Sequence, residues 1–356
     1  MKIKVFVIDD SAVMRQFMSN AISRDGEVML SGSAPDPIIA YRKMKTKWPD
    51  VILLDIEMPK MDGITFLKQI MSERPTPVVI CSTHTEKGAA LSLEALSSGA
   101  VEVVNKPKSN LSGYLSGEGG REILEALKAA GRAKVKPLKY LAEKSYRKKM
   151  SPDTVLEPMM GDVNVVTDHI IVIGASTGGT EAIFNLLANM PPNSPPIAIV
   201  QHMPVSFTGA FAQRLALSTR HKVVEAKSGT RMEQGTVYVA PGGKHMLIKR
   251  HSKEYYLDIK DGPLVSRHKP SVDVLFRSAA QNAGPNAIGL ILTGMGDDGA
   301  LGMLEMRQAG AMTFAESESS CVVFGMPKEA IAKGGVEKVY SLTSLPYQIQ
   351  KYLEFR

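Results

Sequence analysis

One strand-to-helix turn limits what this chain can fold into more than any other segment. Residues 170–173 are a short apolar run typical of a buried strand, and they end in the small-residue sequence Gly-Ala-Ser-Thr-Gly-Gly at 174–179. A helical apolar pattern begins directly afterwards, over 181–187. Glycines at the first and fifth positions of this turn permit a sharp bend that projects the hydroxyl of Ser176 outward, ahead of helix N-terminal amides. The pattern predicts a nucleophile elbow, although a glycine-rich phosphate-binding loop has the same local appearance.

Two later apolar runs also end in chemically active residues. His202 follows the run at 197–200, and a glycine-rich turn with Asp297 and Asp298 follows the run at 288–292. The carboxyl ends of parallel strands line one crevice of an α/β sheet, so a serine, a histidine and an aspartate placed there can converge. Such a trio is typical of serine hydrolases. The residue pattern alone does not separate Asp297 from Asp298.

Each member of this trio has an expected role. Ser176 is the candidate nucleophile and His202 the candidate base, because an imidazole accepts and returns a proton near neutral pH. An aspartate then orients the imidazole, and backbone amides near Thr177 and Met295 are candidate oxyanion-hole donors. The chain order Ser, His, Asp differs from that of the α/β-hydrolases. This argues against that family and not against the chemistry, since a triad is defined by geometry.

The first third of the chain has a different signature, made of acidic strand ends. Asp9 and Asp10 follow the apolar run at 3–8, and Asp55 follows the run at 51–54. Three carboxylates at neighbouring strand ends form a hard oxygen site of the kind that Mg²⁺ accepts. Ser82 and Lys106 end two further strands. A metal, a lysine and a hydroxyl around one carboxylate can stabilise an acyl phosphate, which makes Asp55 the candidate phosphoryl acceptor.

Strand and helix patterns alternate in both halves, which predicts an α/β protein. Strands near 3–8, 28–33, 51–55, 78–82 and 101–104 indicate a flavodoxin-like, doubly wound parallel sheet with the order 2-1-3-4-5. Strands near 170–174, 197–201, 236–240 and 287–293 indicate a second doubly wound α/β domain. Alternating residues around 245–259 predict a β-hairpin appended to that second sheet.

A length of 356 residues agrees with two domains. We expect one domain at 1–121, a linker at 122–166 that begins with a helix near 122–130, and a second domain at 167–356. The linker holds much of the net charge of +7. Such a patch attracts nucleic acid, anionic membranes or acidic proteins, but interleaved aromatic residues and a nucleic-acid-binding motif are missing. We therefore expect a solvated linker and no nucleic-acid partner.

The apolar runs are too short for a membrane span, and the N-terminus enters a strand with no signal-peptide pattern. We therefore expect no direct membrane insertion. Cys81 and Cys321 are the two cysteines, in strand-like contexts of different domains. A disulfide between them is not expected, and a reducing cytoplasm fits this usage.

These motifs resemble two known families. Residues 1 to about 107 resemble the receiver domain of two-component response regulators, through Asp9-Asp10, Asp55 with Met58-Pro59 and Asp62-Gly63, Ser82, and Lys106-Pro107. The segment from about 167 onward is similar to the catalytic domain of the CheB family, through the motifs at 174–179, 201–204 and 292–300. Both matches occur in the right order and cover nearly the whole chain apart from the linker.

The resemblance implies a chemotaxis hydrolase regulated by phosphorylation. It implies that Ser176, His202 and Asp298 form the catalytic triad, that Asp55 is phosphorylated, and that Ser82 and Lys106 are the receiver switch residues. Mg²⁺ would be held by Asp9, Asp10, Asp55 and the backbone carbonyl of Glu57, whereas the hydrolase would need no cofactor. Implied activities are methylesterase action on receptor glutamate methyl esters, with release of methanol, and deamidation of receptor glutamines. Implied partners are methyl-accepting chemotaxis receptors and a chemotaxis histidine kinase.

Two other functional classes are weighed against this one. A receiver can also control a binding or output module such as a transcriptional regulator, but a helix-turn-helix pattern is missing. A nucleotide-dependent enzyme would use residues 174–179 as a phosphate loop, but the lysine of a P-loop does not follow them. Release of methanol from methylated receptors separates these alternatives from the hydrolase.

Overall fold

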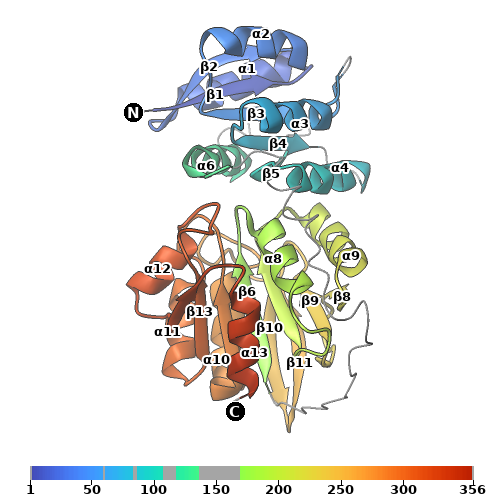
Figure 1. Cartoon of the computed structure of the whole chain (residues 1–356), viewed down its shortest axis with the longest axis vertical. Helices are drawn as coiled ribbons and strands as arrows, with labels where there is room; N and C mark the ends of the chain where they lie inside the picture. The colour runs from blue at the N-terminus through green and yellow to red at the C-terminus, as the bar shows by residue number, and fades with distance from the viewer. Residues whose placement is uncertain (1, 59–60, 83–85, 107–117, 136–168, 355–356) are drawn as a thin grey trace, which may run out of the picture.

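The computed structural model describes residues 2–58, 61–82, 86–106, 118–135 and 169–354, which form two α/β units (Figure 1). Each unit is built around a parallel sheet, as predicted. The expected linker over 136–166 lies outside the described residues. In the described ranges no helix is long and apolar enough to cross a membrane.

The N-terminal unit has a five-stranded parallel sheet with the order β2-β1-β3-β4-β5, which confirms the predicted order. The strands are β1 (Ile3–Ile8), β2 (Val28–Ala34), β3 (Val51–Asp55), β4 (Val78–Ser82) and β5 (Glu102–Asn105). The helices are α1 (Ala12–Ser23), α2 (Pro37–Thr46), α3 (Gly63–Glu73), α4 (Glu86–Ser97) and α6 (Glu118–Arg132). All residues of β3 and β4 are buried, as expected for central strands covered by helices on both faces.

Helix α6 is longer than the helix predicted near 122–130, and it crosses the boundary expected between 121 and 122. Ile123, Leu127 and Ala130 on this helix are buried in the same hydrophobic cluster as Val5 and Val7 of β1. The helix thus belongs to the N-terminal core and is not the start of a linker. Its amphipathic pattern was visible in the sequence, but the basic residues that follow obscured where it ends.

The C-terminal unit has a seven-stranded parallel sheet with the order β14-β13-β12-β6-β7-β9-β8. The strands are β6 (Ile170–Ala175), β7 (Ile197–Gln201), β8 (Lys222–Glu225), β9 (Thr236–Val239), β12 (Ala287–Ile291), β13 (Met312–Glu316) and β14 (Lys338–Tyr340). The helices are α8 (Gly179–Ala188), α9 (Thr208–Ser218), α10 (Val272–Asn282), α11 (Ala300–Gln308), α12 (Met326–Ala332) and α13 (Leu345–Glu354), with short 3-10 turns η2 (Val205–Phe207) and η3 (Gly284–Asn286). Three strands, β8, β13 and β14, were not predicted.

The strands that follow β6 in the sequence are added first on one side of it and later on the other side. β7, β9 and β8 lie beyond one edge of β6, and β12, β13 and β14 lie beyond the other. The order therefore reverses between β6 and β12, and such a switch point opens a crevice at the carboxyl ends of the strands. All three predicted catalytic residues follow β6, β7 and β12, so the topology brings them to that crevice.

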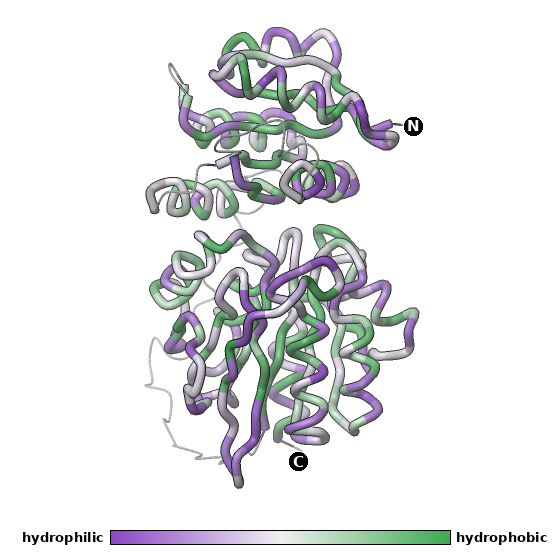
Figure 2. Tube along the Cα trace, turned by 180° about the vertical axis from the view of Figure 1, so that it is seen from behind, coloured by the Kyte–Doolittle hydropathy of each residue, from purple (hydrophilic) through white to green (hydrophobic). Residues whose placement is uncertain are grey.

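The predicted hairpin exists, but it is a sheet of its own. β10 (His245–His251) pairs only with β11 (Glu254–Lys260), antiparallel, and neither strand joins the seven-stranded sheet. Met246, Ile248 and Leu257 are buried against α10 residues in one cluster. The outer end of the hairpin is hydrophilic (Figure 2). The predicted hairpin is thus present, and it is attached to the unit through side-chain packing and not through pairing with the seven-stranded sheet.

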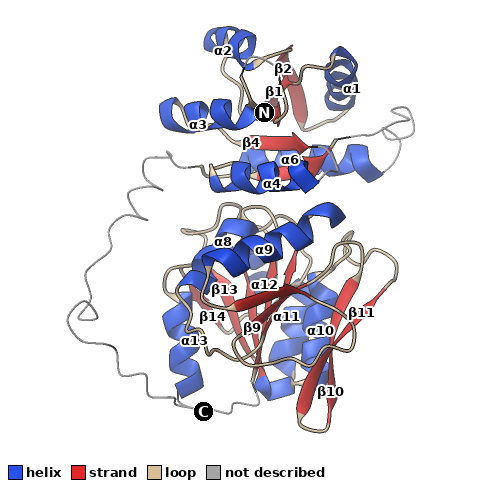
Figure 3. Cartoon of the chain, turned by 90° about the vertical axis from the view of Figure 1, so that its right-hand side faces the viewer, coloured by secondary structure: helices blue, strands red, loops and turns tan. Residues whose placement is uncertain are grey.

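The two units contact each other through α4 and α6 on the N-terminal side. Helix α4 packs against α8, α9 and η2 of the C-terminal unit (Figure 3). Beyond the end of α6, Lys134 N donates to Val322 O at 3.2 Å, and the Val322 side chain packs on the N-terminal hydrophobic cluster. The N-terminal unit therefore covers the crevice end of the seven-stranded sheet.

Gly174 provides a test of how tightly β6 packs in this fold. The sequence suggested that its backbone freedom matters, but its conformation is one that other residues adopt. What excludes a side chain is space, because an ideal Cβ would lie 2.2 Å from Val272 Cγ1. Overpacking costs ~1–3 kcal/mol. We expect Gly174→Ala to lower the free energy of unfolding of the C-terminal unit by that amount in denaturant titrations.

Gly209→Ala is the matched control for this variant. Gly209 lies in α9 of the same unit, and its nearest neighbour atom, Glu225 Oε2, would be 3.8 Å from an ideal Cβ. Alanine also favours a helix over glycine. Equal destabilisation by the two substitutions would show that the contact with Val272 does not cause the loss of stability in Gly174→Ala.

Candidate active site

Ser176 directly follows β6, and contacts to neighbouring strand ends fix its position. Its amide donates to Thr293 O at 3.0 Å, and its carbonyl accepts from Gly179 N at 2.7 Å. Gln201 Nε2 also donates to that carbonyl, at 2.9 Å. Gly178, the N-cap of α8, has a φ of 78°, a left-handed conformation that a β-carbon disfavours. The predicted sharp turn is therefore present, with α8 starting directly behind the serine.

The structure brings His202 and Asp298 together at this crevice. His202 Nε2 lies 2.8 Å from Asp298 Oδ2, and the side chains are 8% and 1% exposed. Because a carboxylate only accepts hydrogen bonds, Nε2 donates here and Nδ1 is the acceptor of the neutral ring. Neither His202 Nδ1, which is buried, nor Ser176 Oγ makes a hydrogen bond within the described ranges. Nδ1 of His202 is therefore an available acceptor, although a hydrogen bond between it and Ser176 Oγ is not formed among the described residues.

Asp298 is held at the N-terminus of α10. Its carboxylate accepts from Ser271 Oγ at 2.7 Å, from Val272 N at 2.8 Å and from Asp273 N at 3.0 Å. Burial opposes its ionisation, but the hydrogen bond and charge interaction with His202 and these further donors lower its pKa. The positive end of the helix dipole also favours an anion at this place. Asp298 is therefore a fixed carboxylate that orients the imidazole.

The adjacent Asp297 is placed differently. It is exposed, and its Oδ1 pairs with Arg267 Nη2 at 3.3 Å. Of the two aspartates that composition could not separate, Asp298 is the one in contact with His202. The distinguishing signal is the α10 N-terminus, which no local sequence pattern around 297–298 reveals.

His268 also belongs to this site, although its sequence context gives no sign of it. Its ring stacks on that of His202, with centroids 3.7 Å apart and planes 8° from parallel. Burial, and to a lesser degree the neighbouring charge of His202, lower its pKa to about 3. His268 is therefore neutral near pH 7. Two preceding residues, Ser266 and Arg267, have left-handed φ values of 49° and 71°, and this bend directs His268 into the site.

The two candidate oxyanion-hole amides have no internal partner. In the part of the chain that the structure describes, neither Thr177 N nor Met295 N donates to another group. Thr293 links their two loops, because its Oγ1 donates to Thr177 O at 3.0 Å. Its own amide donates to the buried carboxylate of Glu316 at 2.9 Å. Two free amides on loops joined in this way can receive a developing oxyanion.

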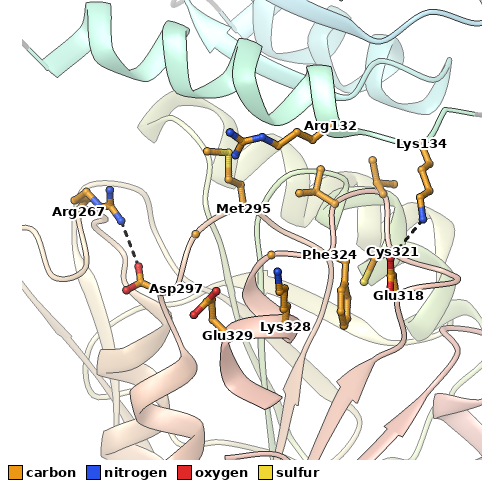
Figure 4. A pocket seen from close by; sticks show the side chains of 14 residues that line it. Arg132, Lys134, Arg267, Met295, Asp297, Glu318, Cys321, Phe324, Lys328 and Glu329 are labelled. Atoms are coloured by element: carbon orange, nitrogen blue, oxygen red, sulfur yellow. Dashed lines mark hydrogen bonds and ion pairs between the residues drawn. The ribbon is translucent and has the colours of Figure 1, made fainter. Parts of the chain in front are cut away.

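A cavity of about 700 Å³ lies next to the site, between the end of α6 and the C-terminal unit (Figure 4). Met295 and Asp297 line it from the catalytic side, and Arg132 and Lys134 line it from α6 and the residues beyond. Lys134 Nζ pairs with Glu318 across it at 3.7 Å. Its lining does not include Ser176 or His202, so the triad is not open to this cavity while the two units are in contact.

The acidic strand ends of the N-terminal unit converge as predicted. One carboxylate oxygen each from Asp9, Asp10 and Asp55 lies within 4.8 Å of the others. Lys106 Nζ bridges two of them, at 2.9 Å from Asp9 Oδ2 and 2.6 Å from Asp55 Oδ2. Oxygen ligands at this spacing fit a hard divalent cation such as Mg²⁺.

Asp55 is one of two buried members of this cluster, with Asp9, and both contact Lys106. Burial, opposed by Lys106 and reinforced by Asp9, raises the pKa of Asp55 to about 6. The amide of Glu57 donates to Asp55 Oδ1 at 3.4 Å. Ser82 ends β4 and donates to Gly88 O at 3.3 Å, so its hydroxyl is engaged with α4 here. Pro107, which follows Lys106 in the receiver motif, lies outside the described residues.

Comparisons with known proteins identify the family of each unit. The family model described as CheB methylesterase matches residues 171–349, and the response regulator receiver domain model matches residues 5–112. Protein-glutamate methylesterase/protein-glutamine glutaminase 1 of Photobacterium profundum is 53% identical over 345 residues, which are 96% of this chain and 98% of the relative. The protein of the same name from Chromobacterium violaceum is 51% identical over 355 residues, which are 98% of this chain and 99% of the relative.

A solved structure shows the same catalytic fold. The Thermotoga maritima CheB methylesterase catalytic domain is 36% identical, covers 54% of this chain and 100% of its own, and has a TM-score of 0.51. Family models cover both units, and near-complete relatives are about half identical. The chain therefore belongs to the CheB family of chemotaxis response regulators, which are receiver-regulated protein-glutamate methylesterases and protein-glutamine glutaminases.

Proposed function

We propose that Ser176, His202 and Asp298 carry the methylesterase reaction of this chain on glutamate methyl esters of methyl-accepting chemotaxis receptors. The observation that carries the proposal is the buried His202–Asp298 pair at the switch point that also presents Ser176. The fixed carboxylate supports a histidine that must become an imidazolium during the reaction.

In the first step Ser176 Oγ attacks the γ-carbonyl carbon of the ester and gives its proton to His202 Nδ1. The carbonyl oxygen becomes an oxyanion, which the amides of Thr177 and Met295 stabilise. The intermediate then expels the methoxy group, which takes the proton from His202 and leaves as methanol. A γ-glutamyl ester of Ser176 remains, and Asp298 stabilises the transient imidazolium.

In the second step water repeats the attack, with His202 again taking the proton, and glutamate is released as Ser176 is restored. A glutamine side chain follows the same route with ammonia as the leaving group. The same residues thus account for the deamidase activity that the family name implies. We expect no cofactor for either reaction, because each proton transfer has a donor and an acceptor among these side chains.

Triad variants test this assignment. We expect His202→Ala and Asp298→Asn each to lower kcat by about 10²–10⁴-fold, because the base or its orientation is lost. Ser176→Ala removes the nucleophile, and adding the other substitutions to it should change little, since the triad acts as a unit. Methanol release from methylated receptor membranes measures each rate.

Asp297→Asn is the matched control, because it makes the same change one residue away. Asp297 is exposed and pairs only with Arg267 among the described residues, and such surface pairs contribute ~0–1 kcal/mol. Its kcat should stay near that of the natural chain. A loss in Asp297→Asn with normal activity in Asp298→Asn would move the carboxylate role to Asp297.

We further propose that the neutral ring of His268 holds the His202 imidazole in position. A stacked aromatic pair contributes ~0.5–1.5 kcal/mol, so His268→Ala should lower kcat by about 2- to 12-fold with little change in KM. His268→Phe restores a flat ring and should recover most of the loss. His251→Ala, at the exposed end of β10, is the control. If His268→Phe were as slow as His268→Ala, stacking would not be the role.

Regulation requires a phosphoryl acceptor, and we propose Asp55 for it. Asp9, Asp10 and Asp55, with the Glu57 carbonyl, would bind Mg²⁺. The cation supplies charge neutralisation at the transferring phosphoryl group. Lys106, already paired with Asp55, would contact a phosphoryl oxygen, and Ser82 would turn from α4 to do the same.

A chemotaxis histidine kinase is the proposed phosphodonor, and we place the protein in the cytoplasm. For the domains we propose a receiver that includes α6, the linker beyond it, and a catalytic domain from about residue 167.

Phosphodonor treatment tests the receiver. In the presence of Mg²⁺ we expect a small phosphodonor to label the natural chain and to raise its methylesterase rate. Asp55→Asn should do neither, and Asp10→Ala should bind Mg²⁺ more weakly, since too few charged oxygens remain. Labelling can be followed by intact mass, and Mg²⁺ affinity by titration calorimetry. Equal labelling of Asp55→Asn and the natural chain would reject the acceptor.

A further inference from the structure

Gln201, the last residue of β7, links the nucleophile to the base through one buried amide group. It lies beside Ala175 of β6 in the register of the sheet and is 3% exposed. Its Nε2 donates to Ser176 O at 2.9 Å and to His202 O at 2.9 Å. The catalytic steps use the histidine of the motif at 201–204, but they give no role to the glutamine before it.

The surroundings of this amide fix its orientation. A carboxamide nitrogen carries two hydrogens, and the two carbonyls use both of them. The reverse orientation would place Oε1 against two carbonyl oxygens, which have no hydrogen to donate. In the observed orientation Oε1 is buried and accepts no hydrogen bond within the described ranges. An unpaired buried oxygen is costly, so a glutamine at this place indicates that its two donated bonds have a function.

The second glycine of the pair at 178–179 makes room for Gln201. An ideal Cβ on Gly179 would lie 2.1 Å from Gln201 Oε1 and 2.7 Å from Ala175 Cβ. The φ of Gly179 is not in the left-handed region, so space and not backbone freedom requires a glycine here. Its amide donates to Ser176 O at 2.7 Å, beside the bond from Gln201. The turn and the glutamine therefore fit each other around one carbonyl.

That carbonyl belongs to the same peptide group as the Thr177 amide. A trans peptide is planar, so its N–H points in the opposite direction to its C=O. Because Gly179 and Gln201 both hold the Ser176 carbonyl, the Thr177 N–H is directed away from them. It has no acceptor in the part of the chain that the structure describes. Hydrogen bonds to a carbonyl also polarise its peptide group, which strengthens the N–H as a donor.

The second bond from Gln201 acts on the base. His202 N donates to Ala175 O at 3.0 Å, and His202 O accepts from Gln201 Nε2. The backbone of His202 is thus held by β6 through its amide and by β7 through its carbonyl. The imidazole that pairs with Asp298 therefore extends from a fixed backbone, and one amide group sets the base relative to the Ser176 peptide.

We propose that Gln201 is the positioning residue of the oxyanion hole, because its amide holds the Ser176 carbonyl and so aims the Thr177 N–H at the oxyanion that forms from the substrate. The proposal rests on the proposed function. Without the Gln201 donor, the Gly179 amide alone holds this carbonyl, and the peptide can rotate and turn its N–H out of the hole. The oxyanion exists only after attack, so the transition state loses stabilisation while binding of the ester does not.

Gln201→Met tests this role in the full chain. Methionine has a similar size but no N–H. In methanol release from methylated receptor membranes, kcat should fall by about 10- to 10³-fold and KM should change by less than about twofold, the upper limit being the loss of a whole oxyanion-hole donor. The variant loses the unpaired Oε1 together with the two bonds, so we expect its Tm to stay within about 4 °C of the natural chain.

Gln201→Glu is the second variant, since it keeps the shape of the side chain. A carboxylate only accepts hydrogen bonds, so this variant should be slow as well. Gln281→Met, at an exposed position of α10, is the matched control and should keep the natural kcat.

Propylboronic acid probes the hole directly. Its boron binds Ser176 Oγ and becomes a tetrahedral anion that resembles the intermediate. Its inhibition constant should therefore rise in Gln201→Met by the factor by which kcat/KM falls. An unchanged kcat in Gln201→Met, a loss confined to KM, or a slow variant with an unchanged inhibition constant would overturn the proposal. Absence of methanol release from the natural chain would instead reject the proposed function.

Discussion

The hydrogen bonds to the Asp298 carboxylate hold the catalytic unit together at its centre. This buried group ties the end of β12 to the N-terminus of α10 through two backbone amides and to the end of β7 through His202. An unpaired carboxylate at this depth would be costly, so its four donors and the start of α10 must be arranged together. Because Val272 at the start of α10 fills the space left by Gly174, the same arrangement also sets β6 and the position of Ser176.

The receiver also buries carboxylates at strand ends, but their negative charge is only partly compensated. Lys106 pairs with two carboxylates, yet the third, on Asp10, is exposed, and the pKa of Asp55 is still raised to about 6. The effect of burial on the pKa of Asp55 thus exceeds the opposing effect of Lys106. Such a site gains from the added positive charge of a bound cation. The His202–Asp298 pair, by contrast, is already formed with its hydrogen-bond donors in the folded chain.

Much of this architecture could be predicted because the functional residues of parallel α/β sheets lie at the carboxyl ends of the strands. Ser176, His202 and Asp55 each follow an apolar run, so the pattern located them and gave the receiver strand order. Contacts made by loops and by docking could not be found in this way. His268 reaches the site through a left-handed bend, and Val322 packs on the receiver core only because two units meet. The hairpin could be predicted from its alternation, but alternation does not reveal that its strands form a sheet of their own.

Coupling between the units depends on how far phosphorylation can shift the docking equilibrium between them. Moving a docking equilibrium from 1:99 to 99:1 requires ~5.5 kcal/mol of differential stabilisation, so the phosphorylation proposed at Asp55 must reach the contacts between the receiver and the catalytic unit. Ser82 connects the receiver site to the catalytic unit, because its hydroxyl donates a hydrogen bond to Gly88 O in α4, and α4 packs on α8 and α9. Withdrawing that bond from Gly88 would remove one of the contacts that fix α4 on the receiver, and α4 is the helix that packs on the catalytic unit. A small movement of this helix therefore changes several contacts between the units together, which is how one switch residue can contribute to a large shift in docking.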